Sequence, residues 1–161
     1  MSAAIYMKVS LKQLFYDTAT SRFLFNVVEE GCKRNIAITV VPDELIEAEM
    51  GGCEKDECIL NLSDSFNFTF ATPLVGRDID GEVEEYRPQP LHDRLCNLQE
   101  LFQFVLKQEL VKQIEVFFTT NYDVGDLEPV DADPNNFATV FEPIIVDNEY
   151  IELYHRFVWK A

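Results

Sequence analysis

The feature that most constrains the fold is a strict alternation of residue types near the N-terminus. Apolar residues stand at every second position from Ile5 to Leu11, and the positions between them include Lys8 and Ser10. Successive side chains of a β-strand point to opposite faces of its sheet, so this pattern predicts a strand with one buried face. The chain must therefore build a sheet and cover one side of it with another layer.

Two more strands are predicted in the N-terminal third. Residues 23–28 are mostly apolar, and Ile36, Ile38 and Val40 alternate with smaller residues. A polar cluster at 17–21 and a turn at 30–35 separate these segments. The N-terminal third is thus predicted to form a β-meander.

Two helices are predicted after the meander. A short one begins at Pro42, a residue favoured at helix starts, and ends at the glycine pair 51–52. The main helix spans about 98–112, because Asn97 and Glu100 resemble a capping box and apolar residues follow at helical spacing. The other extended segments are expected at 58–62, 66–70, 114–120, 137–146 and 150–159, with a short strand at 83–86 and a hairpin turn at Asp147-Asn148.

These elements predict a single α+β domain over residues 1–161. We expect a mostly antiparallel sheet with an N-terminal β-meander and one short and one main helix packed on it. A doubly wound parallel sheet is not favoured, because strands and helices do not alternate regularly. The 161-residue length suits one domain with its own core.

The charge of the chain is strongly negative and unevenly distributed. The net charge is −16, and residues 113–155 contain ten acids and no Lys or Arg, whereas residues 1–42 are net +2. Such a field repels nucleic-acid backbones and anionic membranes and attracts basic proteins. No apolar stretch is long enough to span a membrane, and the first residues do not form a secretory signal, so a cytoplasmic protein with reduced thiols is expected.

Motifs for catalysis or cofactor binding are missing from the sequence. It has no G-x-S-x-G, no dinucleotide fingerprint and no P-loop. Three thiols and an imidazole could form a zinc set, but the pairs are far apart in sequence, and buried core cysteines are the favoured interpretation. The set is Cys53, Cys58, His92 and Cys96. Residues 76–81 resemble part of a calcium loop without its essential end carboxylates. His155 is expected on a buried strand face, as a core residue and not as a catalytic base. Together these observations predict neither an enzyme nor a cofactor nor a metal site.

The candidate site is a protein interface in the acidic loop 121–136. Two prolines stiffen this loop, and a stiff loop loses less entropy when it docks to a basic partner. The predicted partner-binding residues are Tyr122, Asp123, Asp126, Glu128, Asp131 and Asp133. The alternative set lies in the loop before the main helix and consists of Asp78, Asp80, Glu82, Glu84 and Glu85.

The composition is similar to that of small acidic inhibitors, among them immunity proteins that neutralise basic nuclease toxins. This resemblance rests on acidity, aromatic content and the missing catalytic motif, and it transfers no individual residues. It implies an acidic protein-binding inhibitor with a basic protein, such as a nuclease toxin, as its partner. An acidic DNA mimic and a small metal-dependent enzyme are the alternatives.

Overall fold

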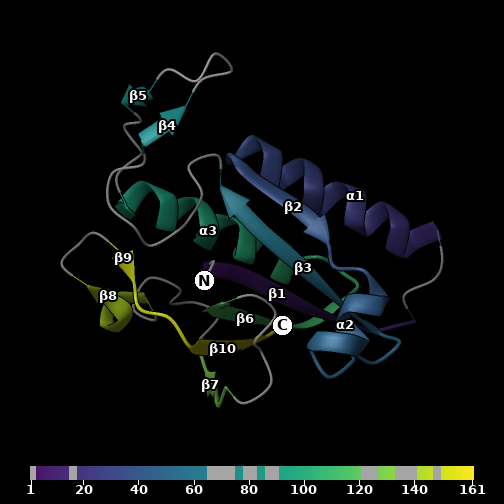
Figure 1. Ribbon diagram of the computed structural model, residues 1–161. Coiled ribbons are helices and arrows are strands. Elements are labelled where there is room, and N and C mark those ends of the chain that lie inside the picture. Colours follow the sequence, from purple (N-terminus) through teal and green to yellow (C-terminus); the bar gives the residue numbers. More distant parts are fainter. Residues whose placement is uncertain are drawn as a thin grey trace.

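The fold was determined as a computed structural model, which describes residues 3–14, 18–64, 75–77, 83–85, 91–120, 127–132, 141–146 and 150–161 (Figure 1). Its main helices are α1 (Thr18–Lys33), α2 (Asp43–Glu49) and α3 (Leu91–Leu106), with a 3-10 turn η1 (Glu142–Ile144). The strands of the large sheet are β1 (Ala3–Leu11), β2 (Ile36–Val40), β3 (Glu57–Asp64), β6 (Val111–Thr120), β7 (Pro129–Asp131) and β10 (His155–Lys160). Two small hairpins pair β4 (Val75–Arg77) with β5 (Val83–Glu85) and β8 (Ile145–Val146) with β9 (Tyr150–Ile151).

The large sheet has the strand order β2-β3-β1-β6-β10-β7. Its neighbours are antiparallel except for β10 and β7, which run parallel. Two connections cross over an intervening strand: β1 leads through α1 to β2, and β3 leads through α3 to β6, with β3 and β1 in between. This split β-α-β order is that of a ferredoxin-like core, extended here by β10 and β7. The predicted α+β class with a mostly antiparallel sheet is confirmed.

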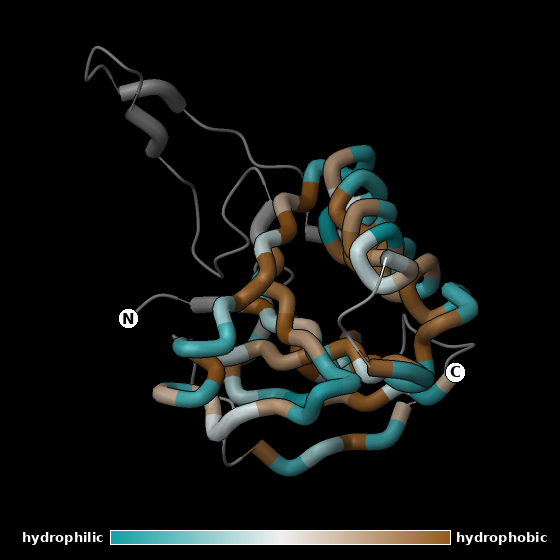
Figure 2. Tube along the Cα trace, turned by 90° about the vertical axis from the view of Figure 1, so that its right-hand side faces the viewer, coloured by the Kyte–Doolittle hydropathy of each residue, from teal (hydrophilic) through white to brown (hydrophobic). Residues whose placement is uncertain are grey.

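One face of the sheet is covered by α1 and α3. Figure 2 shows the helices stacked over the strands on this side. The alternating residues of β1 point into this layer, and Val9 and Met7 are fully buried there with Trp159. The predicted strand near the N-terminus is therefore confirmed, but it is not half-buried, because Tyr6 and Ser10 on its other face are buried as well.

The opposite face carries a smaller core under α2. Ile46 and Met50 from this helix region pack on Tyr6, Ile59 and Phe117 of three adjacent strands. The predicted short helix is confirmed, with Pro42 as its N-cap residue and with the two glycines after it at positive φ of 80° and 84°. Two hydrophobic layers thus sandwich the middle of the sheet, and α2 covers only part of its second face.

The predicted strand at 23–28, and with it the β-meander, is wrong. These residues belong to α1, which buries Phe23, Val27 and Gly31 at a spacing of four residues. The mostly apolar run is compatible with a strand, but only a helix aligns these three residues with Thr20 on one stripe facing the sheet. The N-terminal third is therefore β-α-β, and the chain has three helices among the described residues rather than two.

The main helix is present but shifted towards the N-terminus. α3 begins at Leu91, directly after a proline, and ends at Leu106. A turn follows it, in which Val111 N–H donates a hydrogen bond to the Gln108 carbonyl at 3.0 Å. Asn97 therefore lies inside the helix and is not a cap. The predicted last strand is divided, because Tyr154 has a positive φ of 68° between β9 and β10.

The short strand at 83–86 is confirmed as β5, the strand at 58–62 as β3 and the strand at 114–120 as β6. The expected strand at 66–70 and the hairpin turn at 147–148 lie outside the described residues, although β8 and β9 on either side of that turn do pair. Within the part of the chain that the structure describes, no helix is long and apolar enough to cross a membrane.

Candidate interaction surface

The predicted acidic loop is described only at its C-terminal side. Glu128 and Asp131 are exposed, the first directly before β7 and the second as its last residue, and β7 is paired with β10 in the large sheet. Tyr122, Asp123, Asp126 and Asp133 lie outside the described residues. Of the alternative set, Glu84 and Glu85 lie in β5, with their side chains undescribed, and Asp78, Asp80 and Glu82 are outside the described residues.

An ion-paired row on the open face of the sheet holds this loop end in place. The guanidinium of Arg156 donates to Glu115 Oε2 at 2.7 and 3.1 Å and to the Leu127 carbonyl at 3.1 Å. It also lies over the Phe117 ring, at 5.3 Å from the ring centroid. A half-buried arginine paired with the buried Glu115 therefore anchors the backbone at Leu127, one residue before Glu128.

The same row continues across the sheet to β3. Lys8 Nζ lies 3.4 Å from a Glu115 oxygen and 3.6 Å from a Glu57 oxygen. Gln113 donates to Glu115 at 3.0 Å, and Ser10 donates to Glu57 at 3.2 Å. Glu57 and Glu115 are thus paired with basic side chains of the same chain, which compensate their charge.

The exposed charge gathers on α2 instead. Every exposed residue of this helix except Ala48 is acidic, and Glu54 is exposed nearby on the way to β3. We call these residues the α2 acidic surface: Asp43, Glu44, Glu47, Glu49 and Glu54. Within the described residues, Glu44, Glu47 and Glu49 form no ion pair.

This surface was not among the predicted sites, although the sequence contained a signal for it. Asp43 and Glu44 stand in the first turn, where the helix dipole favours acids. Glu47 and Glu49 stand in the second half of the helix, where the dipole disfavours them, and no basic residue offsets them in the last turn. Acids at both ends of one short helix cannot be explained by helix stability alone.

The four cysteines lie on different parts of the fold, with Cys32 on α1, Cys53 in the segment between α2 and β3, Cys58 on β3 and Cys96 on α3. Cys58 is buried in the core beneath α1 and α3, whereas Cys53 packs beside α2 on the other face of the sheet. Burial raises the pKa of Cys58 to about 12, and burial followed by the nearby Glu57 raises the pKa of Cys53. Both thiols therefore favour the protonated form more strongly than a free cysteine does. Cys96 is half-buried on α3, and the side chain of His92 is undescribed.

The described side chains bring together no group of three His, Cys, Asp or Glu residues that could hold a metal ion. Of the calcium-like segment, only Gly76 and Arg77 are described, both in β4. His155 is half-buried and stacks on Phe157 with ring centroids 6.1 Å apart, while its Nε2 lies 3.5 Å from Glu152. No hydroxyl or thiol nucleophile is hydrogen-bonded to this imidazole among the described contacts.

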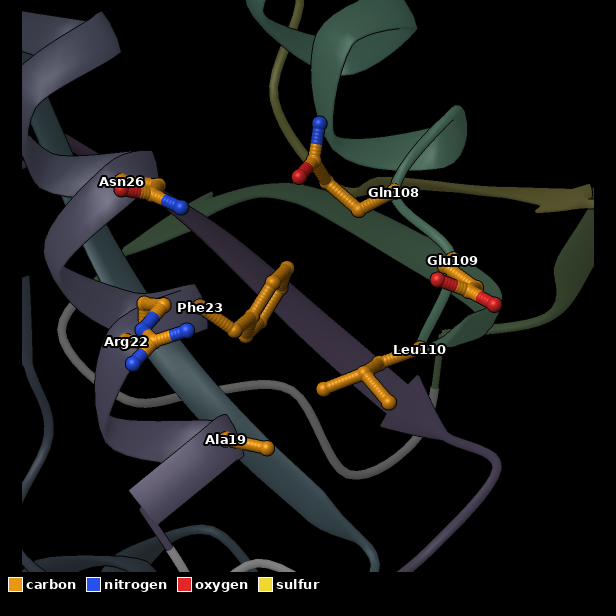
Figure 3. Close-up of a pocket in the computed structure, with 7 residues that line it drawn as sticks. All are labelled: Ala19, Arg22, Phe23, Asn26, Gln108, Glu109 and Leu110. Atoms are coloured by element: carbon orange, nitrogen blue, oxygen red, sulfur yellow. The ribbon is translucent and has the colours of Figure 1, made fainter.

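A small cavity of 160 Å³ lies between α1 and the turn that joins α3 to β6 (Figure 3). Arg22 and Asn26 line its α1 side, and Glu109 and Leu110 line the other. The amide of Gln108 already donates to the Phe104 carbonyl at 3.1 Å. A space of this size holds about one benzene ring, and its walls carry no pair of groups arranged for catalysis.

The structure therefore has three features: α2 with its exposed acids above a packed core, a row of paired charges on the same face of the sheet, and a small cavity whose walls carry no catalytic pair. Comparison with known proteins does not add a family to this description. No protein-family model, curated protein or solved structure matches this chain.

Proposed function

We propose that this protein is an acidic binding protein that docks to a basic protein partner, in its most specific form an immunity protein that neutralises a nuclease-type toxin. The observation that carries the proposal is the α2 acidic surface. Its carboxylates are exposed, and three of them have no ion-pair partner among the described residues. Lysines and arginines that hold nucleic acid on a nuclease offer the matching charge.

The support beneath these carboxylates favours binding over a purely solubilising role. Ile46 and Met50 are buried against Tyr6, Ile59 and Phe117, so α2 cannot turn its acidic side away from solvent. Groups that are already held in place lose less entropy when a partner docks. A concentrated field of one sign also raises association rates by roughly 10–10³-fold at low salt.

The end of the predicted loop adds to the same charge. Glu128 and Asp131 are exposed at the edge of the sheet formed by β7, where Arg156 anchors the adjacent backbone at Leu127. The DNA-mimic and metal-enzyme alternatives stay predictions, and no described contact favours either of them over a basic protein partner.

The test compares two variants of equal net charge. In the first, Glu44→Gln, Glu47→Gln and Glu49→Gln remove charge from the α2 acidic surface with little change of shape. In the matched control, Glu29→Gln, Glu109→Gln and Glu142→Gln remove the same charge from exposed positions elsewhere. Both proteins should remain folded, because exposed substitutions change stability by about 0.5 kcal/mol or less.

The measurement is capture of basic proteins from native extract at low salt, followed by titration of the captured protein and assay of its nuclease activity. The α2 variant should bind at least about 10-fold more weakly than the parent, with a shallower salt dependence, and the control should bind as the parent does. Equal loss in both variants would show that only net charge matters. A parent that captures no basic protein would refute the proposal.

A further inference from the structure

The free edge of β2 and the helix above it form an uncharged surface. We propose that two copies of this chain associate here, with β2 pairing antiparallel to β2 of the second copy and the two α1 helices packing against each other. The large sheet begins at β2, and on the outer side the described strands give it no neighbour. In Figure 1, α1 lies along this same side of the sheet.

The hydrogen-bond register shows which backbone groups of β2 face outward. Val41 N–H donates to the Ile59 carbonyl at 2.9 Å, which makes these two residues a hydrogen-bonded pair. Because such pairs alternate along an antiparallel ladder, Thr39 and Ala37 also bond to β3. The N–H and C=O groups of Ile38 and Val40 therefore point towards the free edge.

The edge lacks the features by which proteins protect an exposed strand. Such strands usually carry a charge, a proline or a bulge that prevents pairing with another chain. β2 reads Ile-Ala-Ile-Thr-Val, with no charge and no proline, and its register with β3 is regular over all five residues. Val40 is 46% exposed at its end.

The side of α1 above this edge is also uncharged. Glu30 and Asn26 mark the side of α1 that faces α3. Arg34 forms ion pairs with Glu30 of α1 and with Glu100 of α3, and Asn26 lines the cavity beside the turn after α3. At 100° per residue, the side of the helix away from α3 carries the following residues: Ser21, Leu24, Phe25, Val28 and Cys32.

This stripe is incompletely covered by the chain itself. Leu24 and Val28 are only partly buried against the core, and Phe25 is 67% exposed. Gly31, at the C-terminal end of α1, lies so close to β2 that an added Cβ would be 2.8 Å from the Ile36 carbonyl oxygen. Helix and edge strand therefore lie in direct contact at this point, and each of them exposes apolar side chains, Phe25 on α1 and Val40 on β2.

The charge of this region favours a second copy over a basic partner. Residues 18–40 hold Arg22, Lys33 and Arg34 against Glu29 and Glu30, so this segment is net +1 in a chain of net −16. A basic partner gains no attraction there, whereas two copies meet without the repulsion that their other surfaces impose. An antiparallel strand edge and an apolar helix stripe are both self-complementary, as a two-fold interface requires.

The first test places like charges in the helix contact. Phe25→Glu should raise the dissociation constant of the dimer at least about 10-fold, because each glutamate faces the second copy's α1. Val130→Glu is the matched control: it makes the same charge change at an exposed apolar residue on the opposite edge of the sheet and should leave the dimer unchanged. Sedimentation velocity across micromolar concentrations measures the association of the parent and both variants.

The second test removes a backbone donor. Val40→Pro deletes an N–H that points to the free edge and does not serve the ladder to β3, so the dimer should weaken by a similar factor. Val40→Thr keeps the N–H and should associate as the parent does. Melting temperatures identify any loss of folding in Val40→Pro, in which case Phe25→Glu, at an exposed position, decides the question.

Two results would overturn the inference. A parent that sediments as a monomer at all concentrations shows that the edge does not pair with a second copy. A parent dimer that both Phe25→Glu and Val40→Pro leave intact shows that another surface holds it. If a monomeric parent binds a basic protein and Val40→Pro weakens that binding, the edge belongs to that partner and self-association is excluded.

Discussion

Replacement of Trp159 by alanine tests whether the covered face of the sheet is the stabilising core. The indole is fully buried, and its ring centroid lies 5.8 Å from Phe102, 6.0 Å from Phe157 and 6.2 Å from Phe141. These contacts join β10 to α3 and to the segment that leads into η1. A buried tryptophan removes about 150–250 Å² from water, equivalent to about 4–6 kcal/mol at about 25 cal/mol per Å².

Alanine retains part of this burial, so we expect Trp159→Ala to lower the free energy of unfolding by about 3–5 kcal/mol. For a domain of this size, that corresponds to a fall in melting temperature of roughly 6–20 °C. Urea and thermal unfolding followed by far-ultraviolet circular dichroism measure the loss without the missing fluorophore. Val130→Ala, at an exposed residue of the edge strand β7, should change the stability by less than about 0.5 kcal/mol. A loss below about 1 kcal/mol in Trp159→Ala would refute the assigned core.

Two further predictions concern the buried thiol and the close approach of α1 to β2. Burial raises the pKa of Cys58 from 9.0 to about 12, so above pH 9 the unfolded chain binds fewer protons than the folded one. The free energy of unfolding should therefore fall as the pH rises, by up to about 1.4 kcal/mol per pH unit. Urea titrations between about pH 8 and 10 measure this slope, and Cys58→Ala should reduce it. Gly31→Ala should destabilise by about 1–2 kcal/mol in urea unfolding, because the clash with the Ile36 carbonyl outweighs the better helix propensity of alanine. Asn26→Ala, exposed on the same helix, should be neutral or slightly stabilising.

The parts of the fold that the sequence predicts are those fixed by a local pattern. The alternation from Ile5 to Leu11 needs a sheet with one covered face, and β1 is the strand that lies at its centre. Pro42 and the glycines at 51–52 bound α2 because their backbone preferences act locally. Such signals do not depend on which distant elements later pack together.

The errors occur where tertiary packing decides between two local possibilities. Residues 23–28 are apolar enough for a buried strand, and only packing across the sheet aligns Phe23 and Val27 with Gly31 as a helix stripe. For α3, Asn97 has a capping side chain, but Leu95 and Leu98 already belong to the buried stripe, so the helix starts after Pro90. A proline directly before an apolar periodic segment was the stronger start signal.

The candidate site was difficult to predict because the sequence shows how many charged residues there are but not which of them form ion pairs in the fold. Glu115 lies 41 residues from Arg156 and yet shares two hydrogen bonds with it, and Lys8 joins both Glu115 and Glu57. These contacts compensate the charge of two acids. The acids of α2 stand on a helix whose other side is buried, which turns a diffuse negative segment into a defined surface.

The two proposed surfaces adjoin along the chain but can be separated by experiment. β2 ends at Val40, and α2 begins three residues later at Asp43. In an antiparallel β2 pair, the two Val40 residues lie about four strand positions apart, or roughly 14 Å, so the α2 acidic surfaces lie at opposite ends of the pair. This separation exceeds the ~8 Å screening length of physiological salt, so neither acidic surface strongly repels the other.

Loss of one function should therefore leave the other intact. The triple glutamine variant of the α2 acidic surface should sediment as the parent does, while it binds the basic partner more weakly. Phe25→Glu should bind the same number of partner molecules per chain while losing self-association, and with it any avidity towards a surface that displays several partners. If instead Phe25→Glu abolished partner binding in solution, α1 and α2 would have to belong to one interface. The partner would then have to reach around the end of β2, and the separation of an acidic docking surface from a neutral self-pairing edge would be wrong.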